Sequence, residues 1–150
     1  MPSLFEPQTA HNIIYRINQL QPSTQRKWGK MSVAQMLFHC KEALGTATGN
    51  TTTNIPFFLR IIGPIFIRKM VLSPKPYKEG LPTAKELIIK ENKNFEEEQL
   101  AALNRINQFI SNGAKNVEGL KQPLFGKMTA EEWGFSQWKH FDHHLKQFGV

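Results

Sequence analysis

The chain has 150 residues, of which 40% are hydrophobic and 11% aromatic, a composition that excludes a disordered chain and predicts one packed domain over residues 1–150. The net charge of +7 permits binding to nucleic acid or an acidic membrane, but no dense basic run is present, so a nucleic-acid partner is disfavoured. The single cysteine, Cys40, excludes a disulfide within the chain. It suits a reducing cytosol, and residues 1–6 lack the features of a signal peptide, so we expect a cytoplasmic protein.

Basic side chains are concentrated in the first half of the chain. Residues 21–80 contain nine lysines and arginines against two acidic residues, Glu42 and Glu79, whereas the charges of the rest of the chain balance. This diffuse asymmetry predicts a solvated basic surface or a small anionic ligand.

The first two predicted helices have clear starts and apolar stripes. A helix from Thr9 is expected because isoleucine and leucine recur at helical spacing as far as Leu20. The second helix follows Ser32, which forms a capping box with Gln35, and its apolar stripe extends to Ala47. A polar loop is expected at residues 50–54.

The most apolar segment, residues 55–72, is interrupted by three basic residues and by Gly63-Pro64. These interruptions exclude a membrane-spanning helix, which needs about 20 predominantly apolar residues. We expect a broken, partly buried helix, with a membrane-surface element as the alternative. Three prolines and a glycine then make residues 73–82 a long crossover.

The start of the third main helix is ambiguous, because residues 83–86 and 94–97 each contain a capping-box pattern. We expect a short or irregular piece at residues 84–90, then a firm helix from Asn94 to Asn112. After a loop at residues 114–127, the fourth main helix follows Thr129 and extends to about Gln147. No segment alternates as a strand does. The prediction is an all-α four-helix bundle with a long crossover between helices two and three.

The C-terminal helix carries a pair of histidines four residues apart. At about 100° per residue, His140 and His144 lie on one margin of the buried face, with Gln137 between them and Trp133 about a turn below. His143 points away from the core, so we expect it on the surface or in contact with a ligand residue. An isolated pair of this kind is a weak motif.

A third imidazole would complete an open metal site, which needs three protein ligands. His39, on the edge of the second helix, is the candidate, although a single histidine there also fits a hydrogen-bonded core residue. Gln35 or Gln137 could accept a hydrogen bond from the second nitrogen of a ligand imidazole, and Trp133 could line the pocket. Cys40, beside His39, is expected to be a small core residue.

Three segments resemble the DinB/YfiT-like superfamily of small, mostly bacterial four-helix-bundle metalloenzymes, and most closely a branch described as a domain of unknown function. They are RKWGKMSVAQMLFHC (residues 26–40), PLFGKMTAEEWG (123–134) and HFDHHLKQFGV (140–150). The resemblance implies a metal triad of His39, His140 and His144 and an up-down-down-up bundle, often dimeric. It further implies a divalent ion (nickel, zinc or iron-like) and a small-molecule substrate. Characterised relatives include S-transferases and isomerases that use low-molecular-weight thiols, and hydrolases are expected among its members.

Two functions of different classes therefore compete. The first is a metal-dependent enzyme that activates a water or a low-molecular-weight thiol, as a hydrolase or a thiol S-transferase does. The second is a non-catalytic helical bundle, structural or ligand-binding, whose histidines are not a working metal site. A nucleic-acid binder is a weaker third alternative.

Overall fold

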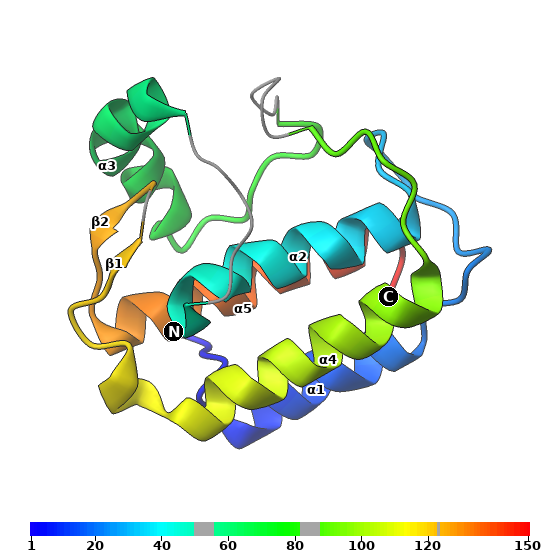
Figure 1. Cartoon of the computed structure of the whole chain (residues 1–150), viewed down its shortest axis with the longest axis horizontal. Coiled ribbons are helices and arrows are strands. Elements are labelled where there is room, and N and C mark those ends of the chain that lie inside the picture. Colours follow the sequence, from blue (N-terminus) through cyan, green and yellow to red (C-terminus); the bar gives the residue numbers. More distant parts are fainter. Residues whose placement is uncertain (50–55, 82–87, 123) are drawn as a thin grey trace.

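Helices account for most of the structure. A computed structural model describes residues 1–49, 56–81, 88–122 and 124–150. That part of the chain contains five α-helices, a 3-10 helix and one small antiparallel sheet (Figure 1). In chain order the elements are α1 (Pro7–Asn18), α2 (Val33–Thr48), α3 (Phe57–Val71), α4 (Phe95–Asn112), η2 (Ala114–Asn116), β1 (Lys121–Gln122), β2 (Gly126–Lys127) and α5 (Ala130–Gln147).

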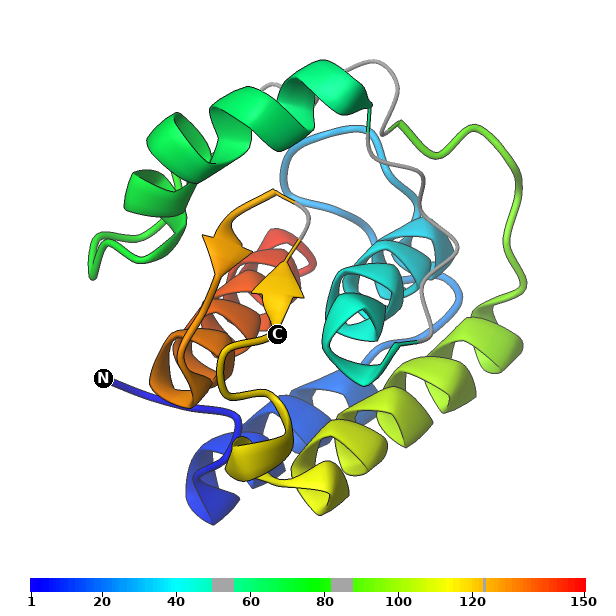
Figure 2. The same ribbon diagram turned by 60° about the vertical axis from the view of Figure 1, so that its left-hand side comes forward.

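Four of the helices pack around one core. α2 contacts α4 and α5, and α1 contacts the same two helices from the other side. α1 and α5 run in one direction along the long axis, and α2 and α4 run in the other (Figure 1). α3 stands apart from these four, above the small sheet (Figure 2). The large side chains of the core come from all four packed helices and are fully buried: Ile13, Ile17, Leu37, Leu44, Ile106, Phe109, Trp133, Phe141 and Leu145.

The helix starts follow from local sequence. The Ser32 hydroxyl accepts a hydrogen bond from the Gln35 N–H, and the Gln35 side chain accepts one from the Ser32 N–H. Thr129 makes the same reciprocal pair at the start of α5, and Asn94 caps α4. The predicted starts of these three helices are confirmed. α1 begins at Pro7, two positions before the predicted start, because a proline suits the first turn, where no N–H is needed.

Two predictions in the middle of the chain were wrong. The expected break at Gly63-Pro64 is absent, since α3 continues through both residues. Pro64 removes one helical hydrogen bond, and Gly63, in the same turn, packs closely against the Leu124 carbonyl. The expected loop at residues 114–127 contains η2 and the β1–β2 pair, in which Lys121 lies opposite Lys127. Strands of two residues are too short to show the alternation that identifies a strand in sequence.

The polar loop predicted at residues 50–54 and most of the irregular piece predicted at residues 84–90 lie outside the described residues. Residues 88–90 are described and belong to no helix or strand. Within the described ranges, no helix combines the length and the hydrophobicity needed to cross a membrane.

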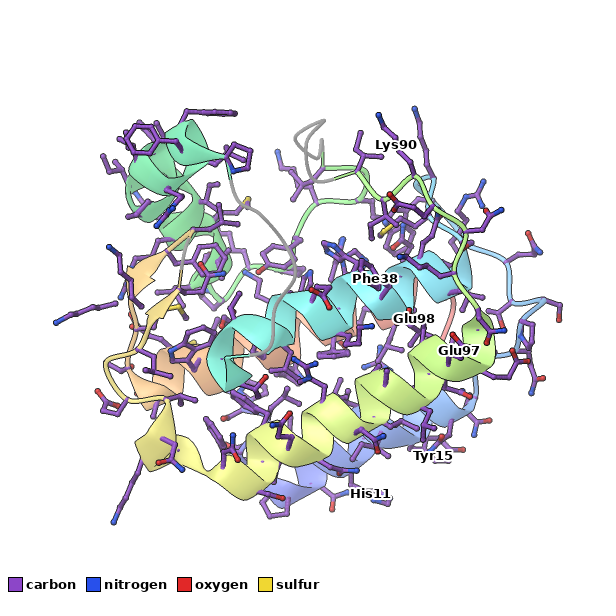
Figure 3. The ribbon with its side chains drawn as sticks, in the orientation of Figure 1. His11, Tyr15, Phe38, Lys90, Glu97 and Glu98 are labelled. Atoms are coloured by element: carbon purple, nitrogen blue, oxygen red, sulfur yellow. The ribbon has the colours of Figure 1, made fainter. Side chains whose placement is uncertain are left out.

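Two well-covered ion pairs fix the helices against each other. The Arg16 guanidinium on α1 lies 2.8 Å from the Asp142 carboxylate on α5. The Lys41 ammonium on α2 lies 2.7 Å from the carboxylate of Glu98, which is on α4 (Figure 3). His11, by contrast, lies on the exposed outer side of α1 (Figure 3). The ion pairs join α1 to α5 and α2 to α4, so each of α2 and α5 is tied to one neighbouring helix.

Candidate metal centre

Three histidines meet between α2 and α5. His39 comes from the middle of α2, and His140 and His144 come from successive turns of α5. Each offers one ring nitrogen, and these three atoms all lie within 4.8 Å of one another, close enough to bind a single metal ion. The ring centroids form a nearly equilateral triangle with separations of 4.8, 4.9 and 4.8 Å, and the rings are steeply inclined to each other.

All three imidazoles are held in the neutral form. Burial, reinforced by the charge of His143, lowers the pKa of His39 from 6.5 to about 4. Burial and the charge of His39 lower the pKa of His144 to about 3. Burial and then the neighbouring histidines also place the pKa of His140 well below its usual value. At neutral pH each ring therefore keeps a lone pair, which metal coordination requires.

Gln147 fixes the tautomer of His144. The Nδ1–H of His144 donates to the Gln147 Oε1 at 2.8 Å, while the Gln147 Nε2 donates to the Trp28 carbonyl, also at 2.8 Å. Because the amide orientation is set by Trp28, the Oε1 faces Nδ1, and the lone pair of His144 is on Nε2. Sequence reasoning missed Gln147. Its spacing of three residues from His144 on the same helix was the available signal.

Gly29 allows this contact. Its φ of +80° lies in the left-handed region, and a Cβ at this position would come within 2.4 Å of the Gln147 Nε2. The Lys27 N–H donates to the Gln147 main-chain carbonyl at 2.7 Å in the same loop. Residues 27–29 therefore clamp both the side chain and the backbone of Gln147, and through it they orient His144.

His140 contacts another histidine of the triad. Its Nε2 lies 2.9 Å from the Nε2 of His39, so one nitrogen donates and the other accepts. Its Nδ1 is buried and has no hydrogen-bond partner among the described residues. The Gln137 Oε1, three residues earlier on α5, is also buried and without a donor there. Gln137 and His140 therefore do not hydrogen-bond to each other, and the acceptor role predicted for Gln137 is not observed.

The remaining predicted site residues lie in different places. Gln35 makes its hydrogen bonds away from the histidines, to Ser32 and to the carbonyls of Ile89 and Glu91. Trp133 is fully buried in the core. Cys40 is also fully buried, and burial raises the pKa of its thiol, so it is an unreactive core residue.

His143 lies outside the triad but touches it. Its ring centroid is 5.1 Å from that of His144, and it also packs against Trp28 and Tyr77. It borders a surface cavity of about 390 Å³ whose walls include both aromatic rings and Lys27. The expectation that it points away from the core is met, but the crossover residue Tyr77 covers it.

The chain matches one family model over residues 5–149, that of a protein of unknown function (DUF1569). No curated protein and no solved structure matches the chain.

Proposed function

The chain belongs to the DUF1569 family of proteins of unknown function, and we propose that it is a metal-dependent enzyme whose divalent ion is bound by His39, His140 and His144. One observation carries the proposal. Three neutral imidazoles from two helices present their nitrogens to a common point, with every pair within 4.8 Å. Neutral nitrogen ligands suit nickel, zinc or iron-like divalent ions, which we expect here.

The donor set fits an open site. Three protein nitrogens leave at least one position of a four-coordinate ion for another ligand, as in catalytic zinc sites. An ion held by the three histidines is a Lewis acid. It lowers the pKa of a water or a low-molecular-weight thiol at its open position, and this gives a nucleophile at neutral pH. We propose hydrolase or thiol S-transferase chemistry on this basis.

The chain's own residues orient the ligands and offer a place for substrate. Gln147 keeps the Nε2 lone pair of His144 directed at the cluster. The cavity bordered by Trp28, Tyr77 and His143 is large enough for a small molecule, and it adjoins the triad through His143, whose ring centroid lies 5.1 Å from that of His144, although none of the three proposed ligands lines it. We assign the small-molecule substrate to this cavity.

The fold supports the same proposal. α1 and α5 run one way and α2 and α4 the other, with α3 between α2 and α4 in the chain, and this order agrees with the up-down-down-up bundle that the resemblance to the DinB/YfiT-like superfamily implies. We propose this fold, and with it one domain, a homodimer and a cytoplasmic location.

Cobalt(II) binding tests the proposed function, because the visible absorption of Co²⁺ reports its coordination number. We expect the metal-free protein to take up Co²⁺ with the intense bands of a four- or five-coordinate ion. Adding 2-mercaptoethanol should produce a sulfur-to-cobalt charge-transfer band if the open position accepts a thiol. The variant His140→Ala should lose the visible bands, whereas His11→Ala, on the outer side of α1, should keep them. A weak, octahedral spectrum in the wild type would refute the proposal.

One observation favours the non-catalytic alternative. The Nε2 atoms of His39 and His140 lie at hydrogen-bonding distance, 2.9 Å, so the pair can satisfy itself without an ion. A purely structural cluster predicts that added Zn²⁺ leaves the melting temperature of the metal-free protein unchanged. A metal site predicts an increase that grows with Zn²⁺ concentration.

A further inference from the structure

The outward side of α3 is covered by large apolar side chains. Their exposed fractions range from 42% to 76%. We call this set the α3 apolar face: Phe57, Phe58, Ile61, Ile62, Ile65 and Phe66. Exposed apolar residues are ordinary when scattered, but six on one side of a 15-residue helix form a contiguous patch of the kind that marks an interaction surface.

The packing of α3 fixes the direction of this face. Leu59, Gly63 and Val71 are the buried residues of the helix, and a Cβ on Gly63 would come within 2.2 Å of the Leu124 carbonyl. On a helical wheel these three positions share one side, and Ile65 and Phe58 fall opposite them. The apolar face therefore points away from Leu124, against which the helix packs, and α3 itself lies apart from the four packed helices (Figure 2).

Polar contacts secure the same orientation. The Arg68 guanidinium donates to the Phe125 carbonyl at 2.9 Å and pairs with the Glu132 carboxylate on α5 at 2.6 Å. The Lys139 ammonium on α5 donates to the Val71 and Ser73 carbonyls at the C-terminal end of α3. A helix anchored in this way presents a rigid surface rather than a frayed segment.

The charges around the face have one sign. α3 contains no acidic residue, and its basic side chains Arg60 and Lys69 are exposed. Lys75 and Lys78 follow within the next few residues, with Glu79 as the nearest acidic neighbour in sequence. A second copy of the chain seated on this face would bring like charges together, with no acidic group on α3 to pair with them. An anionic surface complements both features.

We propose that α3 docks the protein on the surface of an anionic lipid bilayer. The α3 apolar face enters the boundary between headgroups and acyl chains, and Lys69, which the helical wheel places within this face, contacts the anionic headgroups. The helix lies in the plane of the membrane, over a length of about 22 Å at 1.5 Å per residue. This docking requires no metal, so it stands or falls independently of the proposed function.

Vesicle co-sedimentation tests the proposal with the full-length protein. We expect binding to vesicles that contain phosphatidylglycerol, weak binding to vesicles of phosphatidylcholine alone, and loss of binding as salt rises. The variant Phe66→Asp should reduce partitioning about tenfold or more, since it places a charge in the inserted face. The matched control is Leu100→Asp, which changes an apolar side chain of 61% exposure on α4 and should bind as the wild type does.

A charge variant keeps the test independent of apolar substitutions. Lys69→Glu changes the charge by two units and should weaken binding to anionic vesicles about 25-fold, at about fivefold per unit charge, whereas Lys115→Glu on η2 should not. Absence of binding to anionic vesicles would overturn the proposal, as would equal losses in the α3 variants and their controls. A lipid-independent dimer that Phe66→Asp converts to a monomer would overturn it in favour of a second copy as the occupant.

Discussion

The side-chain oxygen of Gln147 accepts a hydrogen bond from Nδ1 of His144 at 2.8 Å. This contact links the proposed metal ligand to a loop near the other end of the sequence, because the Gln147 amide also donates to the carbonyl of Trp28, 119 positions away. The ligand nitrogen of His144 is therefore selected by Gln147 and Trp28, neither of which is itself a proposed ligand. Outer contacts of this kind set both the direction and the basicity of a ligand imidazole.

Replacing Gln147 by leucine should weaken metal binding without abolishing it. The change removes the acceptor that holds His144 in its Nδ1–H form, and losses of about tenfold to a hundredfold in affinity accompany such changes. Competition with a zinc-binding dye measures the affinity. Gln147→Glu, which keeps an acceptor oxygen, should retain more of the affinity than Gln147→Leu. Equal affinities in wild type and Gln147→Leu would show that the contact does not orient the ligand.

Gly29→Ala should also weaken metal binding, although Gly29 is not a ligand. A Cβ at this position would displace the Gln147 amide, which it would approach to 2.4 Å. The control is Gly113→Ala, because Gly113 has a similar φ of +77° but open space around it, so that change brings backbone strain alone. We expect both variants to lose stability in urea denaturation, and only Gly29→Ala to lose metal affinity. A loss of affinity in both would assign the effect to general destabilisation.

The histidine triad could be predicted because helix geometry is local. The periodicity of α5 places His140 and His144 on one face, and the caps at Ser32 and Thr129 fix where α2 and α5 begin. The sequence also indicated that His143 turns away from the other two. Each of these inferences needs only the residues of one helix. His39 was chosen as the third ligand because it is the remaining histidine in the middle of a helix.

What the sequence could not predict depends on distant contacts. α3 continues through Pro64 where Gly63 packs against the Leu124 carbonyl, a contact that no local pattern reveals. The role of Gln147 depends on the Trp28 carbonyl and on the space left by Gly29. Gln35 was assigned to the histidines from its place on α2, but its amide bonds to the Ile89 and Glu91 carbonyls in the crossover.

The metal-free protein should lose stability in acid. The pKa values of His39 and His144 are lowered to about 4 and about 3 in the folded state, below the 6.5 of the unfolded chain. Between these values the unfolded chain binds more protons, so the free energy of unfolding falls as pH falls below about 6.5. Each group contributes up to about 1.4 kcal/mol per pH unit in that window.

Urea denaturation at about pH 7 and about pH 5 measures this dependence. The variant His39→Gln removes one of the titrating imidazoles, so its stability should fall less steeply over the same interval. The same slope in the variant and in the wild type would contradict neutral burial of His39.

The most direct test of the metal centre is the metal content of the histidine variants. The metal-free chain, dialysed against Zn²⁺ and analysed for elements, should hold about one ion. His39→Ala, His140→Ala and His144→Ala should each fall far below this content, while His11→Ala, exposed on α1, should match the wild type. Stoichiometric zinc that survives in His140→Ala, with the fold intact by circular dichroism, would contradict the assignment of these three histidines as the metal ligands.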